Sequence, residues 1–278
     1  MQDLLIPDTE GSGAYPALME VVPDFPGFVI YRPKDLTVFG SDRNLGILVW
    51  GNGGCTDDGA SARLHLAEIA SHGFLVVAPG NILNGPSASK DAPAAVYMAT
   101  TKADMERALA WALNENVREG GPFQGRIDTE AVAVAGHSCG GMLAIMVAAD
   151  PRVRALIVHN SELFPNHPQR PTLLTDPTML KALHTPVLYV VGNETDVGFP
   201  VAMDDYSRIE HVPVMVASLG TAGHEGTFRQ ESGGVAATVA VHWLEWQLRG
   251  SEEAAKTFIG EDCLLCTDAN WTVKRKGF

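Results

Sequence analysis

Short apolar segments that alternate with helical ones constrain the fold of this chain more than any other feature of its sequence. The segments Phe74 to Ala78, Ala131 to Ala135 and Val187 to Val191 carry no charged residue and are apolar throughout. This pattern is typical of strands buried on both faces of a parallel sheet. Parallel strands are usually joined by a helix, and these helices cover both faces of the sheet. We therefore expect an α/β fold with a mostly parallel central sheet.

The other predicted elements continue the same alternation along the chain. Further strands are expected at 27–32, 46–50, 155–159 and 214–218, and helices at 60–71, 94–118, 142–149 and 235–248. One domain spanning 1–278 accommodates this order. The stretch between His159 and Val187 is short and rich in proline. It predicts no large helical lid, and hence an open site.

Composition and charge exclude several classes of partner. The net charge is −13 and the sequence pI is about 5.0, so the surface should repel nucleic-acid backbones and anionic membranes. No apolar run is long enough to span a bilayer. These features favour a neutral substrate, and they say nothing about oligomeric state.

Four cysteines, Cys55, Cys139, Cys263 and Cys266, are compatible with disulfides in an oxidising compartment. A disulfide between Cys263 and Cys266 is favoured, with free thiols as the alternative. A metal site or a redox pair is disfavoured, because no second pair of ligands completes a zinc set. A second disulfide, between Cys55 and Cys139, is a hypothesis. We expect a secreted or periplasmic location, with a cytoplasmic one as the alternative.

The motif with the clearest chemical meaning is Gly136-His137-Ser138-Cys139-Gly140. It has the pattern G-x-S-x-G and lies between a predicted strand and a predicted helix, which is the context of a nucleophile elbow. The turn is strained, and its glycines leave room around a serine hydroxyl that projects above the sheet edge. Ser138 is therefore the candidate nucleophile.

A serine nucleophile needs a base and an acid, which follow it in the order serine, acid, histidine in this kind of fold. His224 lies in a glycine-rich loop after the last predicted strand, whereas His211 precedes that strand and His242 lies in the closing helix. Asp196 follows the strand 187–191 and is the candidate acid, with Glu194 as its rival.

An oxyanion hole would require two backbone N–H donors near Ser138. The residue after the nucleophile, Cys139, is expected to supply the first. The second is expected from Asn52 or Gly53 in the glycine-rich segment that follows the strand 46–50. Phe164 and Phe199 are candidates for lining a substrate subsite, with ordinary packing as the alternative.

These motifs together resemble those of the α/β-hydrolase superfamily, in particular the cutinase-like and polyester hydrolases and the dienelactone-hydrolase-like esterases. The resemblance is carried by Ala70 to Phe74, Gly136 to Gly141, Gly192 to Asp196 and His224. It implies a lidless carboxylic ester hydrolase, often secreted, that needs no metal or organic cofactor. The chain departs from the group at Cys139, where many members have Met or Gln. It also departs after Gly51 in the oxyanion loop, where the group usually carries an aromatic or other side chain and this chain has Asn52 followed by two glycines.

The function predicted from these residues is hydrolysis of a small or polymeric ester through an acyl-enzyme, with His224 as base and Asp196 as its orienting acid. Amide hydrolysis and lactone opening use the same residues and stay open as alternatives. A catalytically silent hydrolase fold that binds a ligand is the alternative from another class.

Overall fold

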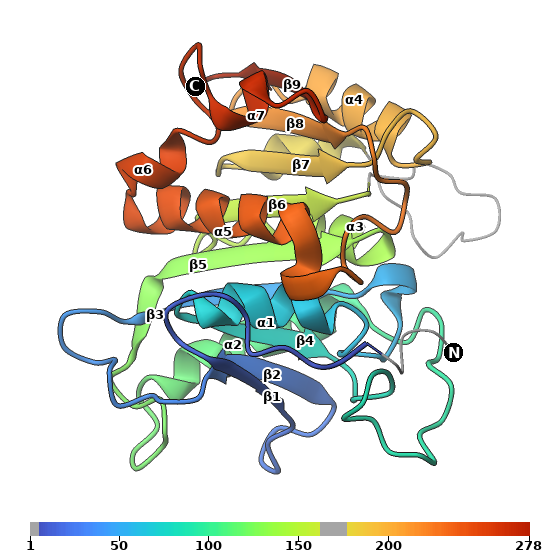
Figure 1. Cartoon of the computed structure of the whole chain (residues 1–278). Helices are drawn as coiled ribbons and strands as arrows, with labels where there is room; N and C mark the ends of the chain where they lie inside the picture. Colours follow the sequence, from blue (N-terminus) through green and yellow to red (C-terminus); the bar gives the residue numbers. More distant parts are fainter. Residues whose placement is uncertain (1–5, 162–176) are drawn as a thin grey trace.

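The computed structural model describes residues 6–161 and 177–278. In this part of the chain, nine strands form a single sheet in the order β1-β2-β4-β3-β5-β6-β7-β8-β9 (Figure 1). The strands are β1 (Ala17–Glu20), β2 (Phe28–Pro33), β3 (Leu45–Gly51), β4 (Phe74–Pro79), β5 (Ile127–His137), β6 (Ala155–His159), β7 (Val187–Val191), β8 (Val214–Leu219) and β9 (Trp271–Lys276). The expected mostly parallel α/β architecture is confirmed.

Parallel pairing is confined to the middle of the sheet. The six strands from β4 to β8 in the sheet order, β4, β3, β5, β6, β7 and β8, pair in parallel with one another, and their residues are almost all buried. β1 and β2 on one side and β9 on the other add antiparallel edges. Only the central strands carry the continuous apolar pattern, because only they are covered on both faces.

Helices cover both faces of the sheet, as expected (Figure 1). The helices are α1 (Arg63–Ser71), α2 (Lys102–Glu115), α3 (Cys139–Val147), α4 (Phe199–Arg208), α5 (Gly234–Arg249), α6 (Glu252–Ala255) and α7 (Leu264–Thr267), with shorter 3₁₀ turns η2 (Gly53–Cys55), η3 (Pro177–Ala182) and η4 (Glu231–Gly233). α1 and α5 pack on one face, and α2, α3 and α4 on the other.

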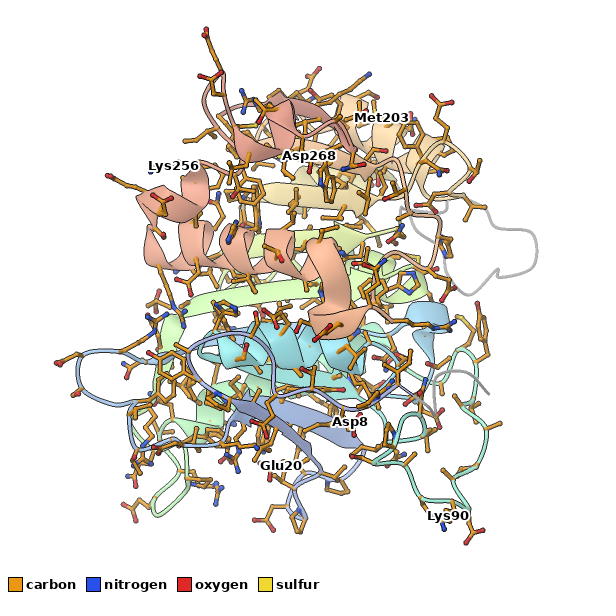
Figure 2. All side chains as sticks on the ribbon, viewed as in Figure 1. Asp8, Glu20, Lys90, Met203, Lys256 and Asp268 are labelled. Carbon is orange, nitrogen blue, oxygen red and sulfur yellow. A yellow bond between two sulfur atoms is a disulfide. The ribbon has the colours of Figure 1, made fainter. Side chains whose placement is uncertain are left out.

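The core is divided into two layers by the sheet. On β3, Ile47 and Val49 belong to the layer under α2 and α3, whereas Leu48 and Trp50 belong to the layer under α1 and α5. This alternation follows from the period of two along a strand. Charged side chains such as Lys90 and Lys256 point outward instead (Figure 2).

The order of the strands creates a crevice at the ends of β3 and β5. From β3 the chain passes to β4 on one side, and later returns to β5 on the other side of β3. Adjacent loops therefore leave the carboxyl ends of β3 and β5 in opposite directions, and ligands of open α/β sheets bind at such switch points. Gly51 of β3 lies directly opposite Gly136 of β5 in the register.

The predicted helix at 94–118 is wrong at its beginning, because α2 begins only at Lys102. Thr101 and Asp104 form a capping box, in which the Thr101 N–H donates to the Asp104 carboxylate at 2.9 Å. Upstream, Met98 has a left-handed φ of 59°, which stops a helix. Its N–H donates to the Gly54 carbonyl at 3.0 Å, so this loop is held against the segment after β3.

Several elements have no counterpart among the predictions. β1, β9 and the short C-terminal helices lack the strong apolar period of the central elements. α4 has apolar residues at helical spacing, Phe199, Ala202, Met203 and Tyr206, although no helix was predicted there. α1 begins three residues later than expected and α3 begins three residues earlier. No helix in the described ranges is long and apolar enough to cross a membrane.

Both pairs of cysteines form disulfides, Cys55 with Cys139 and Cys263 with Cys266. The first joins η2 to the start of α3, and the second closes a short turn before β9. The two disulfide hypotheses drawn from the sequence are therefore confirmed.

Candidate active site

Ser138 occupies a sharp turn between β5 and α3. Its φ of 50° and ψ of −122° lie outside the regions that L-residues prefer, so the surrounding structure must hold this conformation. A Cβ added to Gly136 would overlap the Gly140 carbonyl, and one added to Gly140 would overlap the backbone of Gly51. The close approach of these three backbone segments explains why the turn requires glycine at both ends of its motif.

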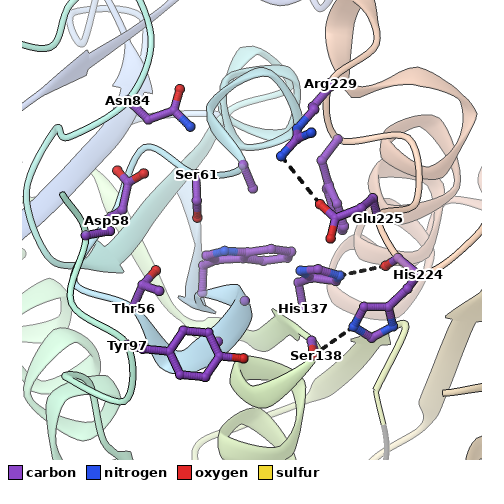
Figure 3. A pocket seen from close by; sticks show the side chains of 16 residues that line it. Thr56, Asp58, Ser61, Asn84, Tyr97, His137, Ser138, His224, Glu225 and Arg229 are labelled. Atoms are coloured by element: carbon purple, nitrogen blue, oxygen red, sulfur yellow. Dashed lines mark hydrogen bonds and ion pairs between the residues drawn. The ribbon is translucent and has the colours of Figure 1, made fainter. Parts of the chain in front are cut away.

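A chain of hydrogen bonds runs from Ser138 through His224 to Asp196. His224 Nε2 lies 3.0 Å from Ser138 Oγ (Figure 3). On the other side of the ring, His224 Nδ1 lies 2.9 Å from Asp196 Oδ1. The three side chains come from the loops after β5, β7 and β8, whose carboxyl ends share one edge of the sheet. Glu194, the rival acid, is exposed to solvent.

Asp196 is buried and accepts four hydrogen bonds. Besides His224, its donors are the backbone N–H groups of Gly192 and Gly198 and the side-chain amide of Asn160, at 2.8–3.0 Å. Burial by itself would raise the pKa of Asp196, but these hydrogen bonds outweigh it and lower the pKa to about 2. The carboxylate is therefore ionised at neutral pH.

Asn160 was not predicted from the sequence, although it directly follows the strand at 155–159. Its side-chain amide donates to Asp196 Oδ2 at 2.8 Å and to the Gly223 carbonyl at 3.1 Å. It thus joins the loop that carries Asp196 to the loop that carries His224. Its φ is 47°, in the left-handed region that asparagine tolerates better than most residues.

His224 and His137 have opposite pKa shifts. The hydrogen bond to Asp196 raises the pKa of His224 above its usual value, against a smaller opposing effect of burial. Burial lowers the pKa of His137, whose Nε2–H donates to the His224 carbonyl at 2.8 Å. A neutral His137 therefore supports the backbone of the His224 loop. Its place inside the pentapeptide was the only available sequence signal for this role.

The candidate oxyanion donors lie on two segments that a disulfide joins. Cys139 is the first residue of α3, where a backbone N–H has no acceptor within the helix. Gly53 lies in the turn η2, and its Cα faces the His137 ring so closely that a Cβ there would clash. Asn52 is buried, and its side chain donates to the carbonyls of Thr56 and Pro79. The Asn52 side chain therefore supports the loop and does not point into the site.

The loop before α2 completes this part of the site. A Cβ on Gly54 would overlap the ring of Tyr97, so the ring lies directly on η2. The backbone N–H of Met98 donates a hydrogen bond to the Gly54 carbonyl, and the Met98 sulfur lies 3.7 Å from the Cys139 sulfur. The residues wrongly predicted as helix thus form one wall of the site.

A cavity of about 340 Å³ opens beside Ser138 and His224. Its lining includes the rings of Trp50, Tyr97, His137 and Phe228. Polar side chains such as Asp58 and Asn84 lie at its far end (Figure 3). Phe199 is not among the lining residues, because it begins α4 and packs against the hydrophobic core. Phe164 and most of the stretch expected to lack a lid lie outside the described residues. The described chain holds no cluster of acidic, histidine or cysteine side chains suited to a metal ion.

Below the cavity, two histidines are completely buried. The rings of His65 and His159 contact each other edge to face, with 4.8 Å between their centroids, and both pack around Trp50 and Phe228. No ring nitrogen of either histidine has a hydrogen-bond partner within the described chain. Burial lowers the pKa of His65 to about 3, so both rings are neutral and act as core aromatics.

Comparison with known protein families and with curated proteins finds no match to this chain. A hydroxyl bonded to a neutral imidazole, whose other nitrogen donates to a carboxylate, can lose its proton as it attacks an electrophilic carbon.

Proposed function

We propose that this chain is a serine-dependent carboxylic ester hydrolase of the α/β-hydrolase class, with Ser138 as nucleophile, His224 as base and Asp196 as the residue that orients His224. The observation that carries the proposal is the hydrogen-bond chain of 3.0 and 2.9 Å that joins these side chains. The strained turn at Ser138 supports it, since such strain persists where function requires the conformation.

The proposed reaction has two halves. Ser138 Oγ attacks the ester carbonyl while His224 Nε2 takes its proton, and the resulting oxyanion accepts hydrogen bonds from the backbone N–H groups of Cys139 and of Asn52 or Gly53. His224 then protonates the departing alcohol, which leaves an acyl group on Ser138. A water molecule, deprotonated by His224, releases the acid and restores the serine. Asp196 remains ionised and stabilises the imidazolium in both halves.

Labelling with a fluorophosphonate tests the proposal, because this reagent reacts with a serine that is activated by a histidine. We expect one adduct on Ser138 by mass spectrometry, and hydrolysis of p-nitrophenyl acetate that Ser138→Ala lowers by about 10⁵-fold or more. Ser207→Ala, a change of an exposed serine on α4, is the matched control and should keep full activity. An unlabelled Ser138 together with no hydrolysis would support a ligand-binding protein instead.

A further inference from the structure

Four polar side chains gather at the far end of the cavity, across from Ser138 and His224. Thr56 and Asp58 follow η2, Ser61 precedes α1, and Asn84 lies in the loop after β4. Figure 3 shows these four side chains on one side of the pocket, facing Ser138 and His224 on the other. A substrate whose ester group lies at Ser138 would therefore extend another part toward this polar end.

The hydrogen bonds around this polar end leave specific groups free to bind a ligand. Arg63 Nη1 donates to Asn84 Oδ1 at 3.4 Å, which turns the amide NH₂ of Asn84 toward the cavity. Asp58 Oδ1 accepts the backbone N–H groups of Ala60 and Leu83. Within the described chain, Asp58 Oδ2 and Ser61 Oγ accept no hydrogen bond. The cavity thus offers a donor amide, an acceptor carboxylate and hydroxyls that do both.

An alkyl chain fits this end poorly. It would remove Asp58, Ser61 and Asn84 from water without giving them a hydrogen bond, and unpaired buried polar groups are costly. The cavity volume of about 340 Å³ is also near the lower limit for ligand pockets, which disfavours long chains.

A cationic group fits poorly as well. Arg63, which pairs with Asp8 at 2.7 Å, lies directly behind Asn84, and Arg229 at the rim pairs with Glu225 at 3.6 Å, so these charges balance and offer a cation no net attraction. Burial raises the pKa of Asp58, which means that its charged form is disfavoured there. A neutral group that donates to Asp58 and accepts from Asn84 matches both residues. The exposed ring of Tyr97 would flank such a group with an apolar face.

We propose that the polar end of the cavity is a subsite for a neutral group with several hydroxyls, so that the preferred substrates are small esters of sugars or similar polyols. This inference rests on the proposed esterase function and specifies the alcohol part of its substrate. It differs from the polyester or long-chain substrates that a resemblance to cutinase-like enzymes would imply.

Three acetate esters that differ only in the alcohol test the subsite. Acetate release is measured from methyl 6-O-acetylglucoside, from hexyl acetate and from acetylcholine. We expect kcat/KM for the sugar acetate to exceed that for each of the others by about 10-fold or more, the effect of one or two well-placed hydrogen bonds. A preference for hexyl acetate or for acetylcholine would overturn the inference.

Variants then assign the preference to named residues. Asn84→Ala and Ser61→Ala should each lower kcat/KM for the sugar acetate by about 5- to 20-fold, mainly by raising KM, and should change hexyl acetate turnover by less than about 2-fold. Asn114→Ala, on the exposed surface of α2, is the matched control and should change neither. Equal losses on both esters would overturn the inference, because they would indicate general damage to the site.

The two proposals fail in different ways. If hexyl acetate is hydrolysed and Ser138 is labelled, but the sugar acetate is not preferred, only the sugar subsite is wrong. If no ester is hydrolysed and Ser138 stays unlabelled, the esterase function is wrong, and the subsite inference falls with it.

Discussion

At the scale of single residues, the site depends on an ionised carboxylate that stays buried. Asp196 is 1% exposed, and its charge is stabilised by four hydrogen bonds and not by solvent. Removing one partner would leave a buried hydrogen-bonding group unsatisfied, and an unsatisfied buried polar group lowers the free energy of unfolding. Asn160 and Asp196 are therefore expected to act as one unit, whose loss affects the orientation of His224 more than binding of a substrate.

The pH dependence of activity tests this arrangement. In the proposed reaction His224 acts as a base, which requires a neutral ring, and the hydrogen bond to Asp196 raises the pKa of His224. In the native protein, kcat/KM should therefore rise with pH through a midpoint above 6.5, the ordinary pKa of histidine.

Asp196→Asn should move this midpoint to lower pH and lower the maximal kcat/KM by about 10³- to 10⁴-fold, because the imidazole then loses its charged partner and its correct tautomer. Glu194→Gln, which removes a nearby exposed carboxylate, is the control and should leave the profile unchanged. An unshifted midpoint in the Asp196→Asn profile would argue against His224 as the titrating base.

At the scale of elements, the two segments that carry the candidate oxyanion donors are covalently joined. Cys139 begins α3 and Cys55 ends η2, so their disulfide fixes the distance between the two backbone donors. Preorganised donors stabilise an oxyanion because they need no rearrangement during the reaction. The bridge is buried at both cysteines, which is consistent with a permanent structural link.

Removing this disulfide should affect turnover more than binding. Cys55→Ala combined with Cys139→Ala keeps both backbone N–H groups, yet it should lower kcat by about 10-fold or more with little change in KM, measured with p-nitrophenyl acetate. The control is Cys263→Ala combined with Cys266→Ala, which removes a disulfide outside the site and should leave kcat unchanged.

Measurements of stability distinguish this loss of turnover from simple unfolding of the variant. The Cys55–Cys139 bridge closes a much longer loop than the Cys263–Cys266 bridge. Its loss should lower the free energy of unfolding by about 4 kcal/mol, whereas loss of the Cys263–Cys266 bridge should lower it by about 2 kcal/mol. Activity is therefore measured at a temperature where circular dichroism shows each variant to be folded. An unchanged kcat in the folded Cys55 and Cys139 double variant would contradict the positioning role.

At the scale of the whole molecule, the core contains imidazoles that must stay neutral. His65 and His159 are fully buried next to Trp50, and no neighbouring group in the described chain pairs with their nitrogens. An unfolded chain protonates these histidines near pH 6.5, whereas the folded protein does not. The unfolded state therefore binds more protons below this pH, and stability falls as the pH decreases.

The expected loss is measurable between pH 6.5 and pH 5. With a folded pKa of about 3, His65 alone should lower the unfolding free energy by about 2 kcal/mol over this range. Asp196 and Glu68, whose folded pKa values are about 2, contribute mostly below pH 5, since their unfolded values lie near 4. The raised pKa of His224 changes the free energy of unfolding mainly above pH 6.5.

Urea unfolding at several pH values checks this expectation. His65→Phe should keep the aromatic packing and reduce the pH slope, while Ile69→Val, which shortens a buried side chain without a titratable group on the same helix, should keep the native slope. Equal slopes in the native protein and in the His65→Phe variant would show that this ring is not kept neutral by folding.

Local sequence patterns were sufficient to predict the central strands, the turn at Ser138 and the choice of His224. Each of these depends on nearby residues: an apolar run forms a buried strand, and glycines around a serine permit one strained turn. The partners of Ser138 could be ranked because their loops must follow strands whose ends share one edge of the sheet. Their catalytic roles stay predictions.

Only the tertiary structure decided which groups surround that serine. It brought Asp196, and not Glu194, against His224, placed Asn160 between two loops, and packed Phe199 against the core instead of in the cavity. It also turned the segment before α2 from an expected helix into a wall of the cavity. These outcomes depend on contacts between residues far apart along the chain, and a pattern of neighbouring residues does not specify the geometry of such contacts.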